Sequence, residues 1–233
     1  MNTHFQKEIE KLKKKILTQC AIVEENLSAA VNSVFERDDE AARRVIERDR
    51  LIDHNEIEVE EECLKLLALY QPVAGDLRYV VACLKVNNDI ERIGDLCCNI
   101  AERALALCSH EFPARDTISF DEITAKTQKM LNDALDSLFK TDTRIALDVI
   151  RRDDEVDDLN RQIHDRVMEL VKLDPDHALI FVSQLSVSKQ LERIADYATN
   201  ICEDVIYMAT GNIVRHAGPD ADAKIESEPE SEL

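Results

Sequence analysis

The sequence predicts an all-α protein built as two tandem, antiparallel three-helix bundles related by an internal repeat. Glycine and proline, which turns and hairpins need, number only 4 and 5 among 233 residues. Hydrophobic residues make up 45% of the chain and aromatic residues only 4%, so the core has to be aliphatic. These observations exclude an all-β or α/β fold, and the length suffices for one large domain or two domains of about 100 residues.

The first half is expected to hold three helices. Over the opening 35 residues apolar side chains recur at steps of three and four without interruption, the pattern of one buried helix face. A polar turn then offers an aspartate as the N-cap of the second helix, and Pro72 stops that helix because proline disfavours helical geometry at the preceding residue. The third helix opens near Asp76. The apolar positions expected on the buried faces are Ile16, Val23, Leu27, Val31, Val45, Ile46, Leu64, Leu67, Ile93 and Ile100.

The second half is expected to hold three more helices, at about 120–140, 143–172 and 176–210, with Gly211 as the final stop. Its expected core residues are Leu131, Leu135, Val149, Ile150, Ile194 and Ile201. Residues 217–233 carry six acids and one lysine with little to bury, which predicts a disordered acidic tail. The expected domains are therefore 1–110 and 118–211, joined by a link at 110–117 and followed by the tail at 217–233.

An internal repeat underlies this division. Residues 27–53 align without gaps on 131–157 with 11 of 27 positions identical, and residues 90–103 align on 191–204 with 7 of 14 identical. The chain therefore consists of three helices, duplicated, with a longer first helix in the first copy.

The net charge of -19 limits the partners. So acidic a chain repels phosphate backbones, which excludes general nucleic-acid binding, and attracts cations or basic surfaces. The opening residues do not resemble a signal peptide, and no apolar stretch is long enough to span a membrane, so we expect a cytoplasmic protein. The lysines at 11, 13, 14 and 15 indicate a solvated helix face, or else a contact with an anionic partner. The seven cysteines, without CxxC spacing, are expected to be mostly buried and reduced.

Paired acids recur at the same places in both halves. Residues four apart share one helix face, and neighbouring helices of a bundle lie about 8–10 Å apart, so four carboxylates from two helices can converge on one cation. A cation or protonation is needed to relieve their repulsion. Such oxygen-rich ligands suit magnesium, manganese or iron ions better than zinc. The candidate metal ligands are Asp49, Asp53, Glu91 and Asp95 in the first half, and Asp153, Asp157, Glu192 and Asp196 in the second.

Three other interpretations stay open at this stage. The acids could form structural ion pairs with Arg48, Arg92, Arg152 and Arg193. The protein could be a di-metal carboxylate enzyme of the ferritin-like type, although the Glu-x-x-His motif of those sites is missing from the sequence. It could also be a metal-free helical scaffold. In the extended acidic stripe, Asn160 and His164 stand where the first half has Glu56 and Glu60, which predicts that two metal sites would differ in ligand set.

The acidic motifs also carry a family resemblance. The sequences ERIGD at 91–95 with NIAE at 99–102, and ERIAD at 192–196 with NICE at 200–203, are similar to the paired motifs of the PhoU family. Leu77-Arg78 and the closing segment 211–216 resemble that family too, so the resemblance spans about residues 3–216.

This resemblance implies two tandem three-helix bundles whose E/D-x-x-x-D motifs bind metal clusters, with the eight acids named above as ligands. It implies a non-enzymatic negative regulator of phosphate uptake, which represses the phosphate-starvation response when phosphate is plentiful. The implied partners are the ATPase subunit of the phosphate ABC transporter, the phosphate sensor histidine kinase and a second copy of the chain. Any membrane association would be peripheral and mediated by these partners.

Overall fold

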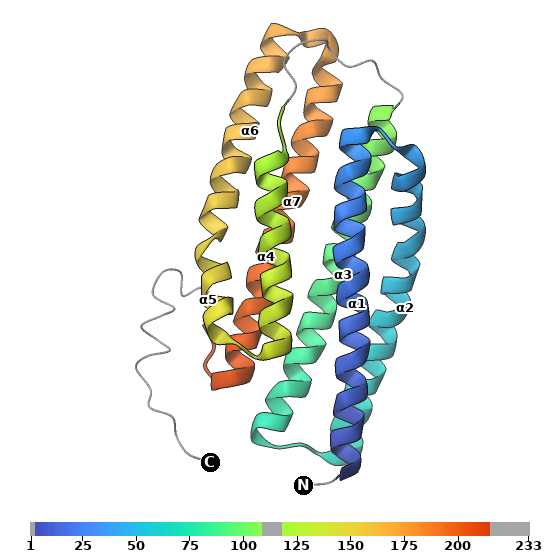
Figure 1. Ribbon diagram of the computed structural model, residues 1–233, viewed down its shortest axis with the longest axis vertical. Coiled ribbons are helices and arrows are strands. Elements are labelled where there is room, and N and C mark those ends of the chain that lie inside the picture. The colour runs from blue at the N-terminus through green and yellow to red at the C-terminus, as the bar shows by residue number, and fades with distance from the viewer. Residues whose placement is uncertain (1–2, 109–117, 215–233) are drawn as a thin grey trace.

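The structure, a computed structural model, describes residues 3–108 and 118–214 (Figure 1). These ranges contain no strand, and none of their helices is apolar over a stretch long enough to cross a membrane. The expected link at 110–117 and the expected tail at 217–233 lie outside the described residues. The helices are α1 Thr3–Glu36, α2 Asp39–Tyr70, α3 Ala74–Cys108, α4 Asp121–Lys140, α5 Thr143–Arg151, α6 Asp153–Leu173 and α7 Ala178–Thr210, with a short 3-10 turn at Pro175–His177.

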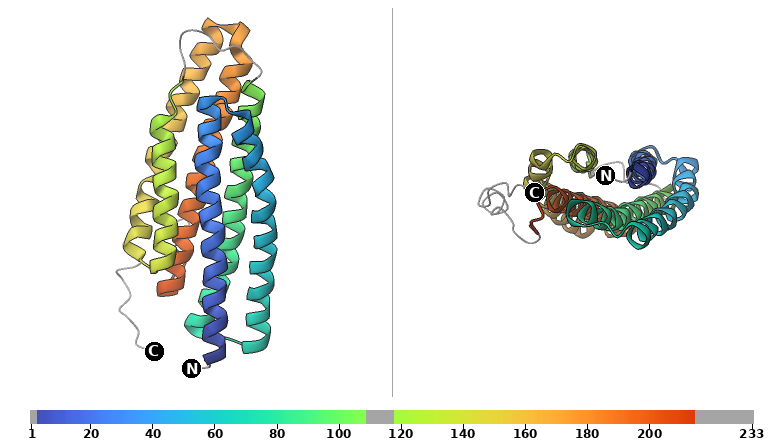
Figure 2. Two further views of the ribbon diagram at one scale, coloured as in Figure 1. Left: turned by 45° about the vertical axis from the view of Figure 1, so that its right-hand side comes forward. Right: turned by 90° about the horizontal axis from the view of Figure 1, so that it is seen from below.

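Two antiparallel bundles, α1–α3 and α4–α7, lie side by side, which confirms the predicted fold class (Figure 1). The two bundles meet mainly through α3 and α7, which form a layer behind α1 and α4, while α2 and α5 lie at the outer edges (Figure 2). The buried apolar side chains of both bundles form one continuous cluster. Polar contacts also cross between α3 and α7: Lys85 Nζ lies 3.0 Å from Asp204 Oδ1, and Arg92 donates to the Tyr197 hydroxyl at 3.3 Å.

The helix ends follow from local sequence. The Asp38 carboxylate caps α2, as predicted, by accepting a hydrogen bond from the Ala41 amide at 2.9 Å. Its repeat equivalent Asp142 caps α5 by accepting one from the Arg144 amide at the same distance. Gly211 ends α7, also as predicted, in the left-handed conformation that glycine adopts at low cost.

Two details of the sequence analysis were wrong. The helix expected over 143–172 is interrupted at Arg152, which divides it into α5 and α6. Leu64 was expected on the buried face but is 53% exposed, because Cys63 and Leu66 occupy that face instead. The remaining expected core residues are buried, except that Ile46, Leu67 and Ile150 are only partly so. All seven cysteines are free, and all are buried except the partly exposed Cys98 and Cys108.

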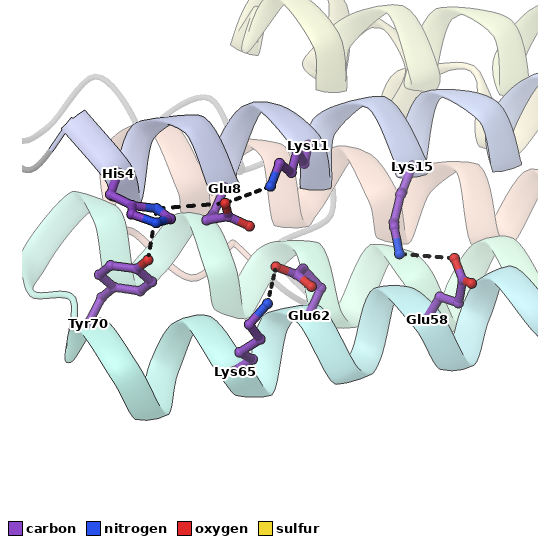
Figure 3. Close-up of polar contacts among 8 residues, drawn as sticks. All are labelled: His4, Glu8, Lys11, Lys15, Glu58, Glu62, Lys65 and Tyr70. Carbon is purple, nitrogen blue, oxygen red and sulfur yellow. Dashed lines mark hydrogen bonds and ion pairs between the residues drawn. The ribbon is translucent and has the colours of Figure 1, made fainter.

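Polar contacts fix the first turns of α1 against α2 (Figure 3). Lys15 Nζ on α1 lies 2.9 Å from Glu58 on α2, and the Tyr70 hydroxyl lies 3.2 Å from His4 Nδ1. The buried carboxylate of Glu8 accepts a hydrogen bond from Lys11 at 2.7 Å. Lys11 and Lys15 therefore form ion pairs within the first bundle, an arrangement that neither of the two interpretations of these lysines, a solvated face or a contact with an anionic partner, had anticipated.

Candidate functional site

The first four predicted carboxylates lie together where α2 and α3 pack against each other; we call them the first carboxylate patch. Asp49 and Asp53 project from α2, and Glu91 and Asp95 from α3. Burial raises the pKa of Asp49, Glu91 and Asp95, and the negative charge of Asp53 raises the pKa of all three further. This mutual influence places the four side chains in one electrostatic neighbourhood. Glu56, one turn beyond Asp53 on α2, adds its charge to the same patch because it also raises the pKa of Glu91.

The second carboxylate patch is formed in the same way by Asp153 and Asp157 on α6 and by Glu192 and Asp196 on α7. Burial raises the pKa of Asp153 to about 7, with further contributions from the charges of Asp196, Asp157 and Glu192. Burial and neighbouring acids also raise the pKa of Glu192 and of Asp196. The Asp153 carboxyl is therefore partly protonated near neutral pH unless a bound cation supplies the positive charge in place of the proton.

Basic side chains do not neutralise these patches through ion pairs. Within residues 3–108 and 118–214, none of the eight carboxylates makes an ion pair. Arg48 contacts Glu25 at 2.5 Å and Arg152 contacts Asp133 at 2.6 Å, away from the patches. Arg92 and Arg193 lower the pKa of the neighbouring acids only through longer-range attraction. The ion-pairing interpretation therefore finds no support at Arg48, Arg152 or Arg92.

The carboxylates share a patch but do not form a closed ligand set. In the described part of the chain, no group of three or more His, Cys, Asp or Glu side chains is arranged so as to hold a metal ion. The chemistry of the donors nevertheless fits a hard cation, since all are carboxylate oxygens. Asp49 Oδ1 is also buried without a hydrogen-bond partner, which leaves one acceptor available for such an ion.

Asn160 and His164 of the acidic stripe contact side chains outside the two patches. Asn160 Oδ1 accepts a hydrogen bond from the Ser188 hydroxyl at 2.8 Å, and His164 Nδ1 lies 3.4 Å from Asp165 Oδ1. The Asn160 oxygen and the His164 ring nitrogen are therefore engaged by Ser188 and Asp165, which are not patch residues.

Sequence reasoning missed two residues beside the first patch. Gly94 on α3 brings that helix close to α2, because a Cβ atom there would lie 2.9 Å from Ile52 Cδ1 and 3.0 Å from Asp49 Oδ1. Cys98, one turn further along α3, opposes the rise in the pKa of the Asp49 carboxylate. The signal was present in the repeat, where Ala195 replaces Gly94 and Thr199 replaces Cys98.

Comparison with known proteins identifies the family to which this fold belongs. A family model described as the PhoU domain matches the chain twice, over residues 7–104 and 120–205. The chain belongs to the PhoU family. Each matched PhoU domain covers one bundle and contains one carboxylate patch.

The PhoU relatives match over nearly the whole chain. The phosphate-specific transport system accessory protein PhoU homolog 1 of Thermotoga maritima is 33% identical over 210 residues, which cover 90% of each chain. The crystal structure of PhoU from Pseudomonas aeruginosa aligns with a TM-score of 0.86 at 33% identity, covering 89% of this chain and 100% of that one. The phosphate transport system regulatory protein PhoU from Streptococcus pneumoniae aligns with a TM-score of 0.80 at 28% identity, covering 90% and 99% of the two chains.

Proposed function

We propose that this protein is a non-enzymatic negative regulator of phosphate uptake, which represses the phosphate-starvation response when phosphate is plentiful. The observation that carries this proposal is the match to PhoU relatives over about nine-tenths of the chain. Those relatives are named as accessory or regulatory proteins of phosphate transport. The presence of a carboxylate patch in each of the two PhoU domains supports it further.

The regulator acts in this proposal as a metal-binding adaptor. Asp49, Asp53, Glu91 and Asp95 would hold ions in the first bundle, and Asp153, Asp157, Glu192 and Asp196 would hold them in the second. Magnesium, manganese or iron ions suit these oxygen donors, and zinc suits them less well. A bound cation would supply positive charge, not catalysis: it would neutralise the carboxylates and hold α2 to α3 and α6 to α7.

The partners in this proposal are the ATPase subunit of the phosphate ABC transporter and the phosphate sensor histidine kinase, bound in the cytoplasm by a homodimer. The position of the carboxylates favours an adaptor over a ferritin-like enzyme. Asp53, Asp95 and Asp196 lie at the bundle surface, where Asp95 and Asp196 are only partly desolvated by their neighbours, whereas ferritin-like sites are built inside a bundle core from Glu-x-x-His motifs.

A complementation experiment tests the regulatory role. The chain is expressed in a bacterium whose own PhoU gene has been deleted, and a reporter of the starvation response is measured in high and in low phosphate. We expect repression in high phosphate only. A reporter that stays fully active in high phosphate, while the chain is present and folded, would overturn the proposal.

Metal content and partner binding are tested on the purified protein. Elemental analysis of untagged protein should find divalent or trivalent ions, and most of them should be missing from the Asp95→Asn, Asp196→Asn double variant. Protein that takes up no ions but still co-purifies with transporter or kinase would support the metal-free scaffold instead. Light scattering at micromolar concentration should give the mass of a dimer, and a monomeric mass would contradict that part.

A further inference from the structure

The interruption between α5 and α6 is stabilised by the residue at which it occurs. The Arg152 amide donates to the Val149 carbonyl at 3.0 Å, three residues back, where a regular α-helix would use the Asp148 carbonyl. The Arg152 Nε donates to that Asp148 carbonyl instead, at 3.3 Å. The arginine side chain thus satisfies the acceptor that its own backbone leaves unpaired.

Arg152 also fixes this break to a neighbouring helix. Its Nη2 lies 2.6 Å from Asp133 Oδ2 on α4, and the side chains of the pair are only 23% and 19% exposed. Lys129 Nζ lies 2.6 Å from the other oxygen of Asp133 and holds it in place. A planar guanidinium can bond a backbone carbonyl and a carboxylate at the same time in fixed directions, which an ammonium group does less well.

The first bundle has the same arginine but not the same arrangement. Arg48, the repeat equivalent of Arg152, lies in the uninterrupted helix α2 and pairs with Glu25 on α1. At the position equivalent to Asp133 the first bundle has Ala29, so Arg48 has no carboxylate at the place where Arg152 is anchored. The difference between the two copies therefore comes from the anchor and not from the arginine.

We propose that Arg152 is a positioning residue of the second carboxylate patch: by holding the α5–α6 break against α4, it sets the placement of Asp153, the next residue in the chain. This inference rests on the proposed metal-binding role of that patch. Without the guanidinium, the Asp148 carbonyl would recover its regular helical donor, the break would close and the Asp153 carboxylate would turn about the helix axis.

The test measures binding of Mn²⁺ alone by calorimetry in an Asp95→Asn parent, whose first patch is disabled. Arg152→Met removes the positive charge of the residue that precedes Asp153 in the chain, so electrostatics alone predicts Mn²⁺ binding that is unchanged or tighter, whereas loss of positioning predicts weaker binding. We expect affinity to fall by about 10- to 100-fold, the usual effect of removing a group that orients a metal ligand. Arg48→Met in an Asp196→Asn parent is the matched control, and it should not weaken Mn²⁺ binding at the first patch.

A second variant keeps the test decisive if Arg152→Met fails to fold. Arg152→Lys preserves the charge, so electrostatics predicts no change, while the positioning role again predicts weaker binding. Unchanged or tighter binding in Arg152→Lys, or an equal loss in Arg152→Met and in the Arg48→Met control, overturns the inference and leaves the metal-binding proposal intact. An Asp95→Asn parent that binds no Mn²⁺ at all contradicts metal binding at the second patch itself, and this inference falls with it.

Discussion

Gly94 and Ile52 are predicted to be energetically coupled, and their repeat equivalents show how. A Cβ atom on Gly94 would lie 2.9 Å from Ile52 Cδ1 and 3.4 Å from Ile52 Cγ2, in a part of the core where Ile52 is fully buried. In the second bundle the equivalent pair is Ala195 and Val156, so the added methyl group is matched by an isoleucine that has become valine and lost its Cδ1 atom. The substitution Gly94→Ala should therefore change sign with the residue at position 52.

The expected magnitudes follow from two opposing effects. Alanine is favoured over glycine within a helix by about 1 kcal/mol, and forcing an extra methyl group into a packed core costs about 1–3 kcal/mol. Gly94→Ala alone should thus lower the free energy of unfolding by roughly 0–2 kcal/mol. After Ile52→Val, which itself costs about 0.5–1.5 kcal/mol, the clash with Cδ1 is gone and Gly94→Ala should raise stability by up to about 1 kcal/mol.

The assay is a double-mutant cycle: urea unfolding of the wild type, Gly94→Ala, Ile52→Val and the double variant is monitored by circular dichroism in the absence of metal. The coupling energy is calculated from the four free energies of unfolding. We expect a coupling of about 1–3 kcal/mol in favour of the double variant. The reverse substitution Val156→Ile, made against Ala195, should destabilise the second bundle and serves as the internal control. Effects of Gly94→Ala that agree within about 0.5 kcal/mol in the two backgrounds would be additive, and the close approach of α2 and α3 would then not depend on this contact.

Further predictions concern pH, metal and buried polar groups. The pKa of Asp153 is raised from 3.8 to about 7, so the folded metal-free protein retains a proton that the unfolded chain has already released between these two pH values. The free energy of unfolding should therefore fall as the pH rises from about 4 to about 7. The fall should be less steep in Asp153→Asn. Mn²⁺ should raise the melting temperature by mass action, and the Asp95→Asn, Asp196→Asn double variant should lose most of that rise while the metal-free protein melts at the same temperature or higher. Gln19 and Asn26 are fully buried with unpaired side-chain amides, and the residues 104 positions later in the second copy are Ile123 and Met130. Gln19→Ile and Asn26→Met should each raise the free energy of unfolding by about 1–3 kcal/mol in urea titrations. Unchanged stability would mean that these amides are satisfied in solution.

Local sequence was sufficient to predict most of the fold. The caps at Asp38 and Gly211 and the stop before Pro72 depend on residues that act on their own backbone, so their effect can be read without knowing the neighbouring helices. The apolar stripe of α1 was similarly clear because its spacing has no gaps. The stripe of α2 was less so: Leu64 fits a step of three or four as well as Cys63 does, and only the packed bundle shows which of the two faces inward.

The break at Arg152 was not predicted, and the carboxylate that anchors Arg152 lies on another helix. Arg48 and Arg152 are identical and are followed by the same aspartate, so the sequence around them gives no reason for one helix to continue and the other to stop. The partner that differs between the two copies is Asp133, which is 19 residues away and belongs to α4. That the four acids of each patch lie near one another could be predicted, since this needs only helical spacing and adjacent helices. The contacts that orient each acid involve residues distant in the sequence and could not be predicted.

The two patches therefore keep the same acids on different supports. In the first bundle the missing side chain of Gly94 lets α2 approach α3 and leaves Asp49 Oδ1 buried against the glycine. In the second bundle Ala195 fills that space, and the chain before Asp153 is interrupted at an arginine anchored to α4. Packing around a duplicated site can drift in this way as long as the carboxylates remain in one neighbourhood, because electrostatic attraction to a cation depends on the distance and number of charges more than on the exact path of the backbone. The retained acids and the divergent supports are together what is expected if the charge of each patch, and not its packing, is the property that both copies have in common.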